Sequence, residues 1–160
     1  MMIRCSNCRK GFLHPGQTKD HNIGPLFGFD RVLLSEAPAL ICDQCGHIAL
    51  EGEVIESARR KLTELIVRNR EPLTAEEARF LRETIGMTQA QLADRLNLTR
   101  VTVTRWETGE ELGSMQSFVL RTLAAWALDG ALAQLVGAPE ILPAPPISKP
   151  YRIEQSGVAA

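Results

Sequence analysis

Four cysteines in two matched pairs constrain how the first third of this chain can fold. Cys5 and Cys8 form one Cys-x2-Cys motif, and Cys42 and Cys45 form the second. Gly46 follows the second pair and suits the turn there, where the backbone must approach sulfur closely. Two residues between thiols let a tight turn direct both sulfurs at one tetrahedral ion, and two such turns complete a site of four thiolates. The pattern predicts one structural Zn²⁺, because four protein ligands leave no open position for a substrate.

Residues 1–50 contain little else that could stabilise a fold. Turn-forming residues interrupt the segment, and only 27–34 and 39–42 have the character of short strands. A domain of this size usually needs a staple, so we expect 1–50 to be a small zinc-ribbon-like β module. A redox role would need a Cys-x-x-Cys motif within a βαβ unit, and neither pair has that context. The three histidines could replace a ligand in principle, but we interpret them as polar loop residues: His14, His21 and His47.

Helical periodicity begins after residue 50. Apolar residues from Val54 to Ile66 recur at three- and four-residue steps, and Glu71-Pro72 breaks the pattern. We therefore expect a connecting helix within 51–71. Residues 72–138 carry several helix start and stop signals and predict an all-α domain of five helices. Thr74 and Glu77 form a capping box at its start, the fourth helix should run from about Ser114 to Leu128, and a short fifth should run from Ala131 to Val136. From residue 139 to 160 the chain is rich in proline and has no periodicity, which predicts a flexible tail. The expected fold class is α+β.

The sequence TQAQLADRLNLTRVTVTRWETG, residues 88–109, predicts two short helices joined by a tight turn. Thr88 and Gln91 form a capping box, and Asn97 suits a left-handed turn position. On the second helix Val103 and Trp106 should face inward. The outer side should then carry Arg100, Val101, Thr104 and Arg105. This geometry can place a helix in a DNA major groove, although amphipathic helix pairs also occur in many bundles.

The same segment resembles the phage-repressor-like, Xre-type helix-turn-helix family. The resemblance implies that Gln89 contacts phosphate and that Arg100, Val101 and Arg105 reach base edges. The predicted DNA-binding residues are Thr88, Gln89, Thr99, Arg100, Val101, Thr102, Thr104 and Arg105.

Charge gives no general sign of nucleic-acid binding. The chain has a formal net charge of −1, and residues 72–129 contain six arginines, no lysine and eight acids. That balance argues against avid nonspecific binding, so recognition must depend on where a few charges point.

The order of cysteine pair, cysteine pair with glycine, helix and Xre-type domain resembles the MqsA/YgiT-type antitoxin family over residues 3–137. The resemblance implies a zinc module that binds and neutralises a ribonuclease-type toxin. It also implies a helical domain that forms a homodimer and represses its own operon at a palindromic operator. Val101 departs from the polar base-reading residue often found there, and 142–160 lies outside the resemblance.

A stand-alone transcriptional regulator without a toxin partner is the alternative interpretation. An enzyme is not expected, because we find neither a nucleophile–base pair nor an open metal site. The chain shows no signal-peptide pattern and no apolar run long enough to span a bilayer. We therefore expect a cytoplasmic protein with no membrane contact.

Overall fold

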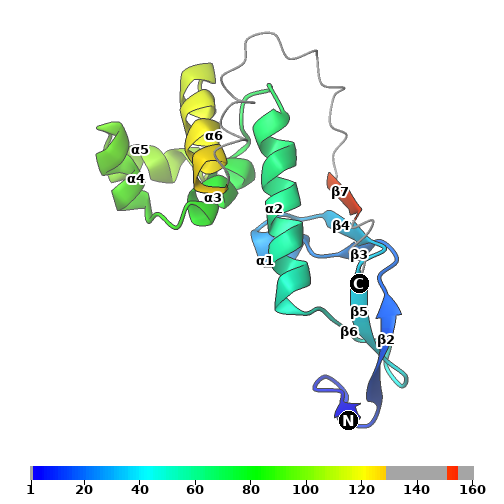
Figure 1. The fold of residues 1–160 in the computed structure, drawn as a ribbon. Coiled ribbons are helices and arrows are strands. Elements are labelled where there is room, and N and C mark those ends of the chain that lie inside the picture. The colour runs from blue at the N-terminus through cyan, green and yellow to red at the C-terminus, as the bar shows by residue number, and fades with distance from the viewer. Residues whose placement is uncertain (1, 129–150, 155–160) are drawn as a thin grey trace.

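The computed structural model describes residues 2–128 and 151–154, and these residues form an α+β fold, as predicted (Figure 1). The N-terminal part is strand-rich, and helices dominate from residue 52 onward. In chain order the elements are β1 (Ile3–Arg4), β2 (Phe12–Gln17), β3 (His21–Asn22), α1 (Gly24–Phe27), β4 (Val32–Ser35), β5 (Pro38–Cys42), β6 (Ile48–Ala49), α2 (Gly52–Arg68), α3 (Ala75–Thr84), α4 (Gln89–Leu96), α5 (Arg100–Trp106), α6 (Ser114–Leu128) and β7 (Tyr151–Glu154).

A four-stranded antiparallel sheet with the order β1-β2-β5-β6 carries the cysteines. The β2–β5 pair is its longest, with Leu13 opposite Cys42 and Gln17 opposite Pro38. None of its described residues belongs to the main buried apolar cluster of the protein. Hydrophobic packing therefore does little to hold this sheet, which agrees with the predicted need for a staple.

The segment 27–34 is only partly a strand, which corrects the prediction for its first half. A helical turn, α1, ends at Phe27, and β4 begins at Val32. Pro25 in the first turn favours helix because its fixed φ suits that position, and Gly28 ends the turn with a φ of 78°. β4 then pairs with β3 on one side and with β7 on the other.

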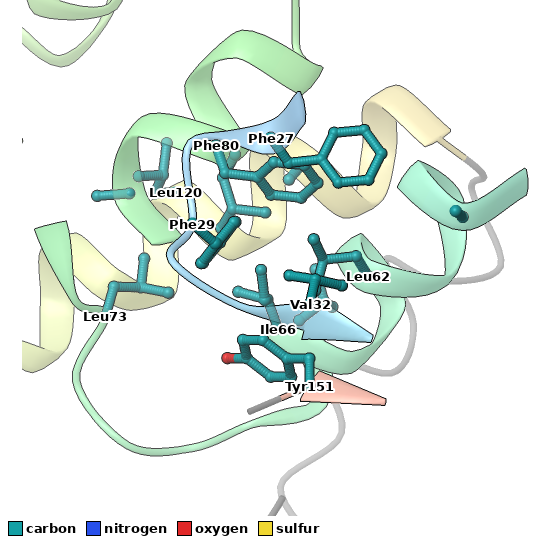
Figure 2. Close-up of a cluster of buried hydrophobic side chains, with 14 of the residues drawn as sticks. Phe27, Phe29, Val32, Leu62, Ile66, Leu73, Phe80, Leu120 and Tyr151 are labelled. Carbon is teal, nitrogen blue, oxygen red and sulfur yellow. The ribbon is translucent and has the colours of Figure 1, made fainter. Parts of the chain in front are cut away.

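One apolar core joins the second sheet to the helices (Figure 2). Phe80 of α3 makes edge-to-face contacts with Phe27 and Phe29, at centroid distances of 5.7 and 5.5 Å. On α2, the fully buried Leu62 and Ile66 face this core. The apolar stripe of α2 thus packs between the N-terminal segment and the helical domain.

The helix signals read from the sequence agree with the structure. Both predicted capping boxes form, one between Thr74 and Glu77 and one between Thr88 and Gln91. α6 has the predicted bounds, while the fifth helix predicted at 131–136 lies outside the described residues. Within the described part of the chain, no helix is both long and apolar enough to cross a membrane.

The prediction of a flexible tail is wrong for residues 151–154. These residues form β7, which pairs in parallel with β4 and buries Tyr151 and Ile153. The remainder of the predicted tail lies outside the described residues. The alternation of apolar and charged side chains in Tyr-Arg-Ile-Glu does suit a half-buried strand, but four residues are too few to stand out from sequence alone.

Candidate nucleic-acid interface and metal centre

The four cysteines converge at the end of the first sheet and are all free thiols. Their sulfurs all lie within 4.8 Å of one another, and Cys5–Cys45 and Cys8–Cys42 are 3.8 and 3.7 Å apart. A tetrahedral ion with Zn–S bonds of about 2.3 Å places its sulfurs about 3.8 Å apart. A disulfide would need sulfurs about 2.05 Å apart. The cysteine cluster (Cys5, Cys8, Cys42, Cys45) therefore suits a tetrahedral ion such as zinc.

The two cysteine turns have matching backbones. Arg9 follows Cys8 with a φ of 58°, and Gly46 follows Cys45 with a φ of 67°. In each turn this residue donates its N–H to the carbonyl of the first cysteine, at 3.0 Å for Cys5 and 3.1 Å for Cys42. The sequence indicated the special turn position at Gly46 but not at Arg9, because arginine carries no signal for positive φ.

Backbone amides point at the sulfurs. The Gly11 amide lies 3.4 Å from Cys8 Sγ, and the Gln44 amide lies 3.4 Å from Cys42 Sγ. Hydrogen bonds from the amides of Gly11 and Lys10 lower the pKa of the Cys8 thiol to about 6, which favours the thiolate that binds metal. A Cβ at Gly11 would lie 2.7 Å from Cys42 Sγ, so the close approach of the two turns requires glycine there.

α4 and α5 form a helix-turn-helix. Asn97 adopts the expected left-handed conformation, with φ 54° and ψ 45°, and the Leu98 amide bonds to the Ala93 carbonyl at 2.8 Å. Val103 and Trp106 are buried at 1% and 6% exposure and anchor α5 to the core. α5 therefore has a fixed inner face and an outer face that is free to meet a partner.

Three predicted contact residues lie on that outer face. Arg100 and Arg105 are exposed, and Val101 is 60% exposed. Arg105 has one long ion pair, 4.0 Å to the exposed Glu110. A pair of this kind is weak and can be exchanged for a stronger partner. We call this surface, formed by Arg100, Val101 and Arg105, the recognition face.

Three of the predicted threonines have structural tasks in the fold. Thr88 caps α4 and Thr99 caps α5. The Thr102 amide donates to Thr99 Oγ1 at 3.2 Å, and the two hydroxyls lie 2.9 Å apart. These interactions hold the amino ends of both helices in place, next to the recognition face.

Gln89 and Thr104 belong to a polar network that sequence reasoning missed. Glu107 accepts two hydrogen bonds from Arg82, at 2.5 and 3.1 Å, and one from Gln89 Nε2 at 2.9 Å. Gln89 Oε1 in turn accepts a bond from Thr104 Oγ1 at 3.1 Å. The network links α3, α4 and α5 and so fixes the recognition face relative to the domain. The only signal in the sequence was Trp106-Glu107 at the end of α5, and nothing there identified Arg82 as its partner.

The helical segment exposes fewer acidic side chains than its sequence suggests. Of the eight acids in the helical segment, Glu77 is buried and the Glu107 side chain is only 6% exposed, and both carboxylates are hydrogen-bonded inside the protein. Hydrogen bonding to Glu107, followed by its charge, raises the pKa of Arg82, so this arginine is committed to the network. The charge that faces outward from α5 comes from Arg100 and Arg105, with Glu110 beside them.

A family model for helix-turn-helix domains, HTH_3, matches residues 79–112, which run from α3 through α5 to the turn before α6. Searches of curated proteins and of solved structures found no match. The chain therefore carries a helix-turn-helix domain as well as a four-cysteine cluster, which supports a DNA-binding transcription regulator.

Proposed function

We propose that the protein is a sequence-specific transcriptional repressor and the antitoxin of a toxin–antitoxin pair, in which α5 reads an operator in the major groove. The observation that carries the DNA-reading part is the recognition face, where two arginines and a valine point outward from a helix whose opposite side is anchored in the core. Binding DNA, and not catalysis, is the proposed role.

The recognition face has suitable chemistry for bases. Each guanidinium can donate two hydrogen bonds to O6 and N7 of a guanine, and Val101 can pack against a thymine methyl group. Val101 and Arg105 are four residues apart and share one stripe of α5, while Arg100 lies on the neighbouring stripe. We propose Thr102 and the amino end of α4 at Gln89 as phosphate contacts, which set the register of the helix.

Replacing Arg105 with alanine tests this assignment. We expect the best operator to bind about 1–3 kcal/mol more weakly, with specificity lost at one base pair. Arg79→Ala is a matched control, because Arg79 is similarly exposed and paired with Glu83 but lies on α3. Selection from random DNA followed by affinity measurements distinguishes the outcomes. A loss that is equal for all sequences would show that Arg105 contacts phosphate instead.

A second copy of the chain should bind through the helical domain. α6 exposes Met115, Phe118 and Trp126 at 70%, 46% and 68%, and their spacing places them along one side of the helix. Three large apolar side chains exposed along one side of a helix are a candidate contact surface, and one recognition helix reads only half of a palindrome. Light scattering should detect a dimer that Trp126→Glu weakens, and an unchanged monomer at all concentrations would contradict this.

We propose that the cysteine cluster holds one Zn²⁺ and that this ion is structural. Four thiolates fill the tetrahedral shell, so the ion would cross-link the β1–β2 and β5–β6 turns and offer no site to a substrate. The first sheet contributes nothing to the main core, which makes such a cross-link energetically useful.

The antitoxin role rests on the resemblance in module order and needs a partner to test it. We expect the zinc module to bind a ribonuclease-type toxin encoded in a neighbouring gene. Footprinting on the protein's own promoter, with and without the neighbouring gene product, tests repression and partner binding together. A promoter that is bound without any such partner gene would favour the alternative, a stand-alone regulator.

A further inference from the structure

The edge of β4 is filled by a strand from the far end of the chain. β7 pairs in parallel with β4, placing Val32 opposite Tyr151 and Ser35 opposite Glu154. All four residues of β4 are buried. Figure 1 shows β7, in red, beside β4 at the outside of the second sheet. The edge that β7 covers therefore offers both backbone hydrogen-bonding groups and apolar surface.

Alternate side chains of β7 enter defined sites. Tyr151 and Ile153 are 3% and 2% exposed, whereas the two residues that alternate with them are exposed. The Tyr151 ring meets Phe29 edge to face at 6.0 Å (Figure 2). Its hydroxyl donates a hydrogen bond to the carboxylate of the buried Glu77. A cavity of about 360 Å³ opens beside the ring, with Phe29, Thr74 and Glu77 among its lining residues. The first site thus takes an aromatic hydroxyl and the second an aliphatic side chain.

An ion pair holds the exposed side of β7. Arg152 forms an ion pair with Asp20, and Asp20 also accepts a 2.5 Å hydrogen bond from Ser35 Oγ. Asp20 is held in a left-handed conformation with a φ of 49°. The Asp20 carboxylate therefore provides an anionic partner for the second residue of the bound strand.

The strand is short and is joined to α6 through residues 129–150, a connection of 22 residues. Its release needs the loss of one short ladder, two buried side chains, the Tyr151–Glu77 hydrogen bond and the Arg152–Asp20 ion pair. It leaves the helices that form the remainder of the core connected to one another. Local openings of this size occur in native proteins without global unfolding.

We propose that the β4 edge is a strand-acceptor site for an extended peptide segment of a partner protein, with an aromatic hydroxyl, a cationic residue and an aliphatic residue at successive positions. In this structure β7 is the chain's own ligand for the site, and a partner strand of that pattern displaces it. Main-chain pairing supplies affinity and the two side-chain sites supply specificity, as in other cases of strand addition. The site is separate from the recognition face and goes beyond the proposed DNA-binding role.

A labelled peptide with the sequence of residues 149–156, KPYRIEQS, is the probe. The receptor is the full chain with Tyr151→Ser and Ile153→Ser, which weaken its own strand. We expect saturable binding by fluorescence anisotropy, and binding about tenfold weaker to the unmodified chain, because the tethered strand competes. A control peptide with aspartate in place of isoleucine should not bind. Equal binding of both peptides, or no binding to a variant that keeps its circular dichroism spectrum and DNA affinity, would overturn the proposal.

Hydrogen exchange on the unmodified chain tests the proposal without any substitution. The amides of β7 that donate to β4 should exchange at least about tenfold faster than those of Leu62 and Ile66 in α2, because β7 opens locally. Identical protection of both groups would show that β7 leaves β4 only when the whole protein unfolds, which would refute a displaceable strand.

Discussion

Replacing Glu107 with alanine tests how firmly the recognition helix is held. The Glu107 side chain is 6% exposed, and that of its partner Arg82 is 10% exposed. The substitution removes both hydrogen bonds to Arg82 and the bond from Gln89, and it leaves a guanidinium in a nearly dry site. The recognition face should therefore lose its main link to α3.

The expected loss of stability follows from that burial. Removing one partner of a buried ion pair costs about 3–5 kcal/mol, because the other charge stays buried. Arg82 keeps its 2.7 Å bond to the Met87 carbonyl and its 3.4 Å ion pair with Glu83, so we expect the lower end, about 3 kcal/mol. The pKa of Arg82 is raised, so its guanidinium stays charged in both the folded and the unfolded protein at every pH below the ordinary value for arginine. The loss should therefore not vary with pH near neutrality.

Urea unfolding at constant m measures this loss directly. Glu110→Ala is the matched control, since Glu110 is 57% exposed and lies 4.0 Å from Arg105. It should change stability by less than about 0.5 kcal/mol. The double substitution Arg82→Met with Glu107→Leu should recover most of the loss, because no charge then remains buried. If Glu107→Ala costs no more than Glu110→Ala, the network does not hold the helix and our reasoning is wrong.

Three further predictions concern the metal site, the interface and β7. Chelation of zinc should disorder the first sheet and leave the helical circular dichroism signal unchanged, because that sheet lies outside the main core. Loss of metal with an unchanged strand signal would contradict this prediction. Glu110→Gln should raise DNA affinity about two- to fivefold in gel-shift assays, since it frees Arg105 and removes a charge facing phosphate; weaker binding would count against the interface. Hydrogen bonding from Ser35, followed by the charge of Arg152, lowers the pKa of Asp20 below its ordinary value of 3.8. The ionised Asp20 therefore stabilises the fold fully above pH 3.8, and this contribution is lost as the pH falls through the lowered pKa. Asp20→Asn should therefore speed hydrogen exchange in β7 at neutral pH, with less further effect of acid than in the unmodified chain.

Local signals identified much of this protein from its sequence. The two capping boxes, the left-handed Asn97 and the bounds of α6 were predictable, because each depends on residues within one or two helical turns. The inward positions of Val103 and Trp106 followed from helical spacing. The cysteine cluster was predictable from two local turns, although its geometry needed residues 40 positions apart to meet.

Contacts between distant residues were decided only by the tertiary structure. Arg82 and Glu107 are 25 residues apart, and Tyr151 and Glu77 are 74 apart, so no periodicity or motif connects them. β7 shows the same limit, since a four-residue strand gains its stability from the β4 edge and not from its own propensity. The sequence by itself determines which short segments become helices and turns, because their hydrogen bonds close locally. The folded structure decides which buried charges pair and which sheet edge a strand joins. Both depend on a match of shape and charge between distant segments, which exists only once the chain has folded.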